Sequence, residues 1–261
     1  MQVLKPGISP DALFEKIQTA PANILMLDYD GTLAPFNPDR ARAFPYPGVR
    51  ERLDKLMHND RTQLVIVSGR QSADLVPLLG LSSPPEMFGC HGGEHFLPAG
   101  DSTFVTLSDR QKEAIDDARR WTERENLTPY CELKPLGLAF HWRGKETEQA
   151  DDIRQRVVSQ WADCARECQL MLHEFDGGIE LRPSDITKAR AVEWLIRVSE
   201  PGTPLAYLGD DLTDEDAFEA VGEQGLKAMV RSSLRTTLAD ILLEPPNDLL
   251  DFLDRWLKSS R

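Results

Sequence analysis

The sequence predicts an α/β protein, with a Rossmann-like parallel sheet that has helices on both faces and an inserted α+β domain. Short apolar runs alternate with helical patterns in both outer parts of the chain, and a strand buried on both faces of a parallel sheet has such a run. Near residue 108 the pattern changes to helix, strand, helix and hairpin, and near residue 184 the first pattern returns. We therefore expect a core of residues 1–107 and 184–261 and an inserted domain of residues 108–183.

The outer parts of the chain contain the elements of the expected parallel sheet. Each strand is a short run of mostly apolar residues, and the helices place apolar residues three and four positions apart. Ser9 before Pro10 is a typical helix start, because a serine cap and a proline in the first turn both suit that position. The expected helices are 9–18, 49–57, 72–79, 186–198, 217–221 and 249–257, and the expected strands are 24–27, 64–67, 87–90, 205–208 and 226–230.

The inserted domain begins with a charged amphipathic helix. Its first residues, Ser108 and Gln111, have the spacing of a capping box. Asp176-Gly177-Gly178 lies between two apolar runs and is a strong hairpin signal. The expected elements are a helix over 108–125, one strand over 131–142, a helix over 146–168, and a hairpin over 170–175 and 179–181.

The composition argues against several classes of protein. Of the 261 residues, 41% are hydrophobic and 28% are charged, as in ordinary soluble domains. The net charge of −13 opposes binding to nucleic acid and to anionic membranes. No apolar run is long enough to span a bilayer, and the N-terminal residues lack the apolar segment of a secretion signal. We expect a cytoplasmic monomer whose four cysteines are reduced thiols.

Two carboxylates follow the first buried strand. Alternate residues of a strand point the same way, so Asp28 and Asp30 are expected to face one site, and Gly31 allows the chain to turn sharply. Ligands bind at the carboxyl ends of the strands in such sheets. Two acids so close repel each other unless a cation lies between them or one keeps its proton. A divalent metal site, a nucleophile beside an acid/base, and a solvated acidic turn all remain possible readings.

Further reactive residues stand at other strand and helix ends. Ser68 follows the second strand, Lys188 opens a helix, and Asp210, Asp211 and Asp214 follow a later strand. Each has an ordinary alternative: a helix cap for Ser68, a solvated side chain for Lys188, and an acidic helix start for the aspartates. Their occurrence together favours one shared site, and carboxylate oxygens suit Mg²⁺.

In order along the chain, these segments resemble the motifs of the haloacid dehalogenase-like phosphatases. Asp28-Tyr29-Asp30-Gly31-Thr32-Leu33 is similar to their first motif, and Val67-Ser68-Gly69-Arg70 is similar to their second. Lys188 fits the third motif, and Gly209-Asp210-Asp211-Leu212-Thr213-Asp214-Glu215-Asp216 fits the fourth. The resemblance covers nearly the whole chain, and the inserted domain lies in the position of the family's α+β cap.

Within that superfamily, the residues of the fourth motif resemble those of the trehalose-6-phosphate phosphatases, which act in trehalose biosynthesis. Gly92-Gly93-Glu94 after His91 is similar as well, and so are the cap segments that contain Glu132-x-Lys134 and Glu180-x-Arg182. The resemblance implies hydrolysis of a phosphorylated disaccharide, trehalose 6-phosphate, through an aspartyl-phosphate intermediate. Substrate-binding roles are implied for Arg70, His91, Gly92, Glu94, Glu132, Lys134, Glu180 and Arg182.

The same resemblance implies a role for each residue of the shared site. Asp28 would attack phosphorus, and Asp30 would protonate the leaving sugar oxygen and then activate water. Mg²⁺ would be held by Asp28, the Asp30 carbonyl and Asp210, with Asp214 or Asp211 in support. The phosphoryl oxygens would be held by Ser68 and Lys188.

Two departures from the family pattern leave the sugar open. Ala189 stands where a glycine commonly follows the third-motif lysine, and the cap strand reads His141-Trp142-Arg143 instead of His-Tyr-Arg. Sucrose 6-phosphate and a glucosylglycerol phosphate are therefore alternative substrates. Transfer of the phosphoryl group to another sugar is an alternative reaction, and a non-catalytic metal-binding module is a third reading.

Overall fold

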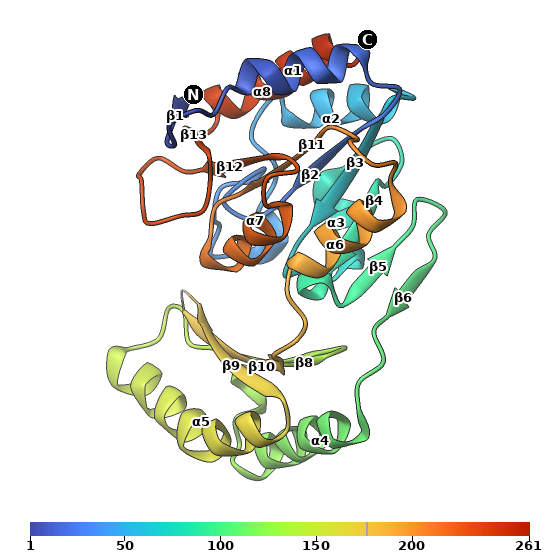
Figure 1. Cartoon of the computed structure of the whole chain (residues 1–261). Coiled ribbons are helices and arrows are strands. Elements are labelled where there is room, and N and C mark those ends of the chain that lie inside the picture. The colour runs from blue at the N-terminus through green and yellow to red at the C-terminus, as the bar shows by residue number, and fades with distance from the viewer. Residues whose placement is uncertain (176) are drawn as a thin grey trace. The chain divides into compact units, whose positions relative to one another are not determined.

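The computed structural model describes residues 1–175 and 177–261. The chain divides into two compact units, one of residues 1–104 and 187–261 and one of residues 105–186. We call them the core unit and the inserted unit (Figure 1). From the sequence we had placed the edges of the insertion at residues 108 and 183. Asp176, in the predicted hairpin turn, lies outside the described residues.

The core unit is built on one large, mostly parallel sheet, which confirms the predicted fold class. In the described residues its strand order is β1-β13-β12-β11-β2-β3-β4-β5-β6. The strands from β13 to β4 are parallel to their neighbours in this order, whereas β1, β5 and β6 pair antiparallel at the two edges. Their bounds are β1 Gln2–Val3, β2 Asn23–Leu27, β3 Thr62–Val67, β4 Glu86–Gly89, β5 Glu94–Phe96, β6 Ser102–Phe104, β11 Leu205–Gly209, β12 Leu226–Val230 and β13 Ile241–Leu243.

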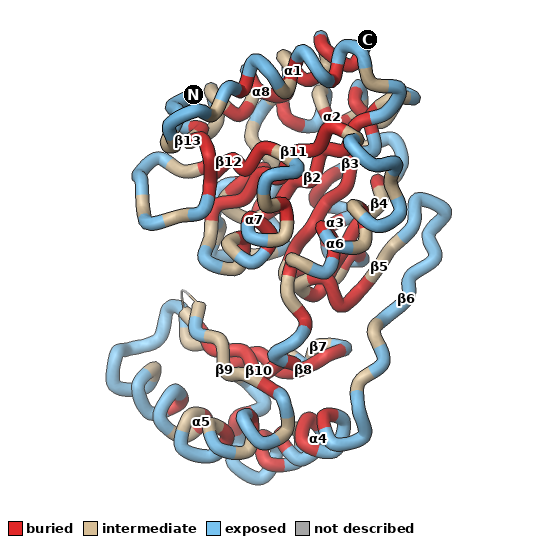
Figure 2. The backbone as a smooth tube through the Cα atoms, viewed as in Figure 1, coloured by how far each residue is buried: buried red, intermediate tan, exposed pale blue. Residues whose placement is uncertain are grey.

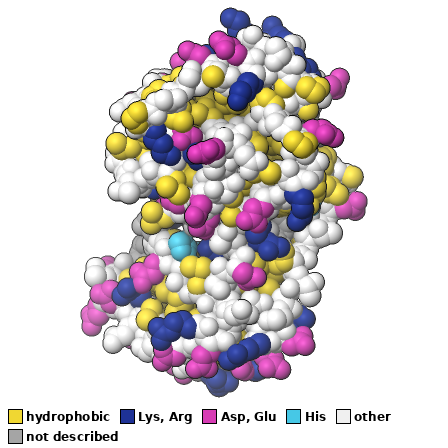
Figure 3. Space-filling view, in the orientation of Figure 1, with side chains coloured by type: hydrophobic (Ala, Val, Ile, Leu, Met, Phe, Trp, Pro, Cys, Tyr) yellow, Lys and Arg dark blue, Asp and Glu magenta, His cyan; other side chains and the backbone are white. Residues whose placement is uncertain are grey.

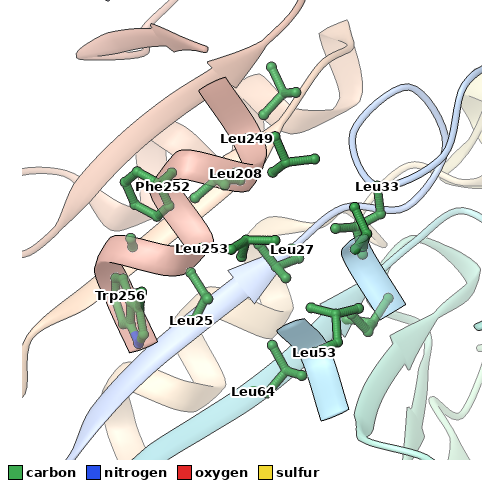
Figure 4. Packing of buried hydrophobic residues seen from close by; sticks show 14 of the residues in the cluster. Leu25, Leu27, Leu33, Leu53, Leu64, Leu208, Leu249, Phe252, Leu253 and Trp256 are labelled. Atoms are coloured by element: carbon green, nitrogen blue, oxygen red, sulfur yellow. The ribbon is translucent and has the colours of Figure 1, made fainter. Parts of the chain in front are cut away.

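Helices cover both faces of this sheet, because successive strand residues point to opposite sides. Leu25 and Leu27 of β2 belong to one buried cluster, and Ile24 and Met26 belong to another. The first cluster includes residues of α1, α2, α3 and α8, and the second includes residues of α6 and α7. Figure 2 shows the strands β2, β3, β11 and β12 as mostly buried, and Figure 4 shows the first cluster. The helices are α1 Pro10–Thr19, α2 Val49–Met57, α3 Ser72–Leu79, α6 Ala189–Val198, α7 Glu215–Val221 and α8 Asn247–Ser259.

The inserted unit has a separate four-stranded antiparallel sheet with the order β7-β8-β10-β9. One face packs on two helices through Trp121, Phe140 and Trp161. Acidic and basic side chains are interspersed over the outer surface of these helices (Figure 3). The elements are α4 Asp109–Arg124, β7 Cys131–Lys134, β8 Gly137–His141, α5 Thr147–Glu167, β9 Leu170–Phe175 and β10 Gly178–Pro183.

Several local expectations can be compared directly with the structure. The Ser9 cap of α1 and the capping box of Ser108 and Gln111 are both present. The single strand predicted over 131–142 is wrong, because the chain reverses at Pro135 and β7 pairs with β8. Proline lacks the N–H that a ladder needs and suits the second position of a turn. In the described residues, no helix is both long enough and apolar enough to cross a membrane.

Leu253 of α8 tests the packing of the first cluster. It is fully buried, so Leu253→Ala should lower the free energy of unfolding by about 2–5 kcal/mol, through lost burial and the cavity left behind. Urea unfolding followed by circular dichroism measures this. The control Val198→Ala removes a side chain that is 54% exposed and should change stability by less than about 0.5 kcal/mol. Equal losses in the two variants would contradict the assignment of Leu253 to the core.

Candidate active site

The carboxyl ends of three neighbouring strands carry the predicted reactive residues. β2 lies between β11 and β3, and all three are parallel. Asp28 follows β2, Ser68 follows β3 and Asp210 follows β11. From β2 the sheet continues on one side with β3 and β4 and on the other side with β11 and β12. Open α/β sheets bind ligands at such a point, where the strand order reverses. Carboxylate oxygens of Asp28, Asp210 and Asp214 lie within 4.8 Å of one another, and all three residues are buried.

Lys188 lies among these carboxylates, immediately before α6. Its Nζ donates to Asp28 Oδ1 at 2.7 Å and to Asp214 Oδ1 at 2.7 Å. Burial alone would lower the pKa of Lys188, but the two carboxylates raise it above its ordinary value. The ammonium therefore stays charged and joins two segments that are distant in the sequence.

One ammonium does not balance the negative charge of three buried carboxylates. Burial raises the pKa of Asp28 to about 7, with Lys188 lowering it and Asp214 raising it. The pKa of Asp210 is raised to about 9 by burial and by its carboxylate neighbours. Groups of one charge held so close need either bound protons or a further cation. The cluster has the electrostatics of a cation site.

Asp214 is fully engaged by protein donors. Its Oδ1 accepts from Tyr207 Oη at 2.7 Å as well as from Lys188, and its Oδ2 accepts from the backbone N–H groups of Asp210 and Asp211 at 3.0 and 2.9 Å. Burial and the nearby Asp214 raise the pKa of Tyr207 well above its usual value, so its hydroxyl remains a donor. Asp214 thus organises the turn that presents Asp210. The carboxylate of Asp211 accepts from the N–H of Leu212 at the start of a short 3₁₀ helix, Leu212–Asp214.

Asp210 has the features of a ligand for a divalent ion. Among the described residues, its Oδ1 is buried and has no hydrogen-bond partner, an arrangement that is costly without a cation. Its carboxylate lies against Gly31, where an added Cβ would fall 2.1 Å from Oδ2. Gly31 also has a φ of +84°, which favours glycine. An oxygen-lined, acidic site of this kind fits Mg²⁺.

Asp30 lies beside this cluster and is held by Arg70. Arg70 Nε donates to Asp30 Oδ2 at 2.6 Å, and Nη2 donates to Oδ1 at 2.6 Å. Arg70 Nη1 donates to the backbone carbonyl of Arg40 at 2.7 Å. The guanidinium also lies 5.7 Å from the centre of the Tyr29 ring. Both oxygens of Asp30 are therefore taken by one side chain.

The turn after β3 packs against the turn after β4. Ser68 is buried, its Oγ accepts from the N–H of Arg70 at 3.2 Å, and its carbonyl accepts from the N–H of His91 at 2.9 Å. The His91 ring lies over Gly69, where an added Cβ would fall 2.5 Å from ring Cε1. Gly92 has a φ of +91°. The structure thus brings Ser68, Arg70 and His91 together, and their contacts with a substrate stay predictions.

Glu94 has a structural explanation in this fold. It is 2% exposed, and its Oε2 accepts from the N–H of Ser72 in the first turn of α3 at 2.7 Å. Its Oε1 accepts from Ser102 Oγ at 2.7 Å. A carboxylate at a helix N-terminus is favourable. These contacts favour stabilisation of α3 over the predicted contact with a substrate.

The remaining predicted residues lie on one sheet of the inserted unit. Lys134 Nζ donates to Glu180 Oε1 at 2.9 Å, and His141 Nε2 lies 2.8 Å from Glu132 Oε2. The register puts Glu132 and Glu180 at the same level on the two neighbours of β8. Arg182 donates to a backbone carbonyl within the same unit. This polar face is opposite the face that packs on α4 and α5, because neighbouring strand residues alternate.

Sequence reasoning missed several partners in these sites. Tyr207 was read only as part of a buried strand, although a buried tyrosine hydroxyl usually needs a partner. Thr32 Oγ1 donates to Asp28 Oδ2 at 3.1 Å, and Thr32 had been read only as motif context. His141 was read as part of a cap strand, and in the structure its Nε2 lies 2.8 Å from Glu132 Oε2. For it the spacing carried no signal, since its partner is on another strand.

Known proteins resemble this chain over most of its length. Residues 26–239 match the family model described as Trehalose-phosphatase. The trehalose-phosphate phosphatase of Mycobacterium tuberculosis H37Rv is 32% identical over 254 residues, which cover 91% of this chain and 62% of that protein. The trehalose-phosphatase of Zygosaccharomyces rouxii is 25% identical over 291 residues, covering 96% of this chain and 32% of that protein. The chain therefore spans less than two thirds of the length of these relatives.

Solved structures share the fold. The C-terminal domain of C. albicans trehalose-6-phosphate phosphatase matches with a TM-score of 0.79 at 22% identity, covering 99% of both chains. Aspergillus fumigatus trehalose-6-phosphate phosphatase, in crystal form 3, matches with a TM-score of 0.67 at 25% identity, covering 98% of this chain and 100% of that chain.

Tyr207 tests the strength of the buried network. Its hydroxyl donates to a carboxylate, whereas the Tyr29 hydroxyl donates to the backbone carbonyl of Ala43 at 2.7 Å. Tyr207→Phe should therefore cost about 1.5–3 kcal/mol of stability and Tyr29→Phe about 0.5–1.5 kcal/mol. Urea unfolding in chelator measures both. A smaller loss for Tyr207→Phe would mean that the Asp214 contact contributes no charge-assisted bond.

Proposed function

The chain belongs to the trehalose-phosphatase family, and from that premise we propose that it hydrolyses trehalose 6-phosphate to trehalose and inorganic phosphate. The observation that carries the reaction class is the buried cluster of Asp28, Lys188, Asp210 and Asp214, whose three carboxylates lie within 4.8 Å of one another. The family match and the similarity to trehalose-phosphate phosphatases support the choice of substrate.

In the proposed reaction, Asp28 attacks phosphorus. Its Oδ1 is oriented by Lys188 and its Oδ2 by Thr32. Asp30 gives a proton to the leaving sugar oxygen as the P–O bond breaks and an aspartyl phosphate forms on Asp28. Asp30 then takes a proton from water, which attacks phosphorus and releases phosphate from Asp28. Both aspartates return to their starting state.

The phosphoryl oxygens need positive partners in so acidic a protein. Lys188 and Ser68 are the proposed protein contacts for these oxygens. We propose that Mg²⁺ is held by Asp28, the Asp30 carbonyl and Asp210, with Asp214 in support through the backbone of Asp210. When bound, the ion supplies positive charge that stabilises the transferring phosphoryl group.

The inserted unit is the proposed cap, and its polar face is the proposed sugar site. Carboxylates suit a polyol, because each oxygen accepts more than one hydrogen bond. Glu132 and Glu180 are held by His141 and Lys134, which limits their freedom before the sugar binds. Arg182 completes this set. Sucrose 6-phosphate, a glucosylglycerol phosphate and transfer to another sugar are the competing readings.

A panel of sugar phosphates tests the activity. Trehalose 6-phosphate should be preferred over sucrose 6-phosphate, glucosylglycerol phosphate and glucose 6-phosphate, with one phosphate released for each substrate consumed. Asp28→Asn should lower kcat by about 10³-fold or more, because the nucleophile is lost. The control Asp54→Asn changes an aspartate that accepts from Ser82 and should keep wild-type rates. Substrate loss without phosphate release would indicate transfer, and near-normal turnover by Asp28→Asn would refute the nucleophile.

Metal binding should depend on pH with a defined sign. Burial raises the pKa of Asp210 to about 9 and that of Asp28 to about 7, so Mg²⁺ must displace protons, and its affinity should rise from pH 6 to pH 8. In chelator, the folded protein binds more protons than the unfolded chain in this range. Stability should therefore fall as pH rises. Titration calorimetry and urea unfolding measure the two effects.

Two neighbouring aspartates provide matched variants for the metal. Removal of a residue that only hydrogen-bonds to a metal ligand typically weakens metal binding by about 10–100-fold. Asp210→Asn should weaken Mg²⁺ binding by more than this, because Asp210 is the proposed ligand itself. Asp211→Asn should bind nearly as the wild type does, because Asp211 accepts from the N–H of Leu212. Equal weakening in both variants would contradict the assignment of the metal contact to Asp210 alone.

A further inference from the structure

The bond between Arg70 and Asp30 bears directly on the proposed acid/base. Asp30 must transfer a proton at one of its carboxylate oxygens, yet Arg70 donates to both of them at 2.6 Å. The Arg70 side chain is 6% exposed and that of Asp30 is 28% exposed. A fork-to-fork pair of this kind fixes the plane of the carboxylate as well as its position. Arg70 therefore determines where the proton-transferring oxygens lie.

Arg70 itself is held at every polar position. Its N–H donates to Ser68 Oγ at 3.2 Å, its carbonyl accepts from the N–H of Cys90 at 2.8 Å, and its Nη1 donates to the Arg40 carbonyl at 2.7 Å. Cys90 and His91 adopt positive φ angles of 50° and 57°. Such conformations are costly in non-glycine residues and persist only where the surroundings impose them. The turn after β4 is thus shaped to receive the Arg70 carbonyl.

We propose that Arg70 is a positioning residue for Asp30, and not the contact for the substrate that the motif resemblance suggested. This inference rests on the proposed function. After Asp30 gives its proton to the leaving sugar oxygen, both oxygens of its carboxylate accept hydrogen bonds from the guanidinium group of Arg70. The same two hydrogen bonds keep the carboxylate oriented until Asp30 takes a proton from the attacking water. Arg70 neither gains nor loses a proton in either step.

The leaving group separates this role from substrate binding. A sugar alkoxide needs a proton to leave, whereas p-nitrophenolate leaves without one. In single-turnover measurements, Arg70→Met should slow release of trehalose from trehalose 6-phosphate by about 10²-fold, the usual size of an acid/base contribution. The burst of p-nitrophenolate from p-nitrophenyl phosphate should stay near the wild-type rate. Asp30→Asn should show the same selective loss, and KM for trehalose 6-phosphate should change little in Arg70→Met.

A double variant tests whether the two residues act as one unit. Arg70→Met combined with Asp30→Asn should be no slower than Asp30→Asn alone, since residues in one network are not additive. Arg70→Lys keeps the charge and guards against misfolding of the Met variant. It should show the same selective loss, because an ammonium cannot form the two-pronged bond. As a control, Arg52→Met removes another arginine–aspartate ion pair, in which Arg52 Nη2 lies 2.5 Å from Asp254 Oδ2. This variant should leave both rates unchanged.

The outcomes are distinct. Equal slowing of both substrates, a rise in KM with an unchanged sugar-release rate, or full activity of Arg70→Lys would overturn the positioning role. An additive loss in the double variant would overturn it as well. If the wild type released phosphate from neither substrate, the proposed function would fail, and the inference with it. Wild-type turnover with no selectivity in the Arg70 variants would refute only the inference.

Discussion

A single buried ammonium group joins the turns at the carboxyl ends of two central strands of the core unit. Lys188 Nζ bonds to Asp28 after one strand and to Asp214 after another. Without it, two carboxylates would remain buried and uncompensated, which proteins tolerate poorly. With it, the three buried carboxylates of Asp28, Asp210 and Asp214 still exceed the single ammonium by two negative charges. Lys188 therefore offsets part of the charge of the cluster, and the excess of negative charge favours a bound cation.

The parallel sheet explains why these groups meet. Asp28, Ser68 and Asp210 are far apart in the chain, but their strands are neighbours and end at the same edge. The rule that side chains at such ends share a site needs only the order of buried runs and turns. The fold class and the residues at the strand ends were thus within reach of the sequence. The two outer strands on each side of the sheet, β1 with β13 and β5 with β6, were not, because each has only two or three residues and too little pattern to identify.

Pairings between side chains were out of reach for a different reason. The bond of Arg70 to Asp30 depends on the geometry of two turns, and spacing along the chain does not encode it. Glu94 shows the same limit: the motif resemblance implies a contact with substrate, whereas its spacing in the chain does not indicate that its oxygens accept from Ser72 and Ser102. The hairpin at Pro135 was missed because apolar residues on both sides of the turn imitate one long strand. Residue types at strand ends are enough to predict where a site lies. The hydrogen-bond partner of each side chain in it comes only from the structure.

The missing side chain of Gly31 links the first motif to the fourth. The space that a Cβ would fill belongs to the carboxylate of Asp210, which would be 2.1 Å away. Every other amino acid at position 31 must therefore displace Asp210 as well as strain the turn. The two positions are thus coupled sterically, although most of the chain separates them. A side chain at position 31 would change the place of the Asp210 carboxylate without any substitution of Asp210 itself.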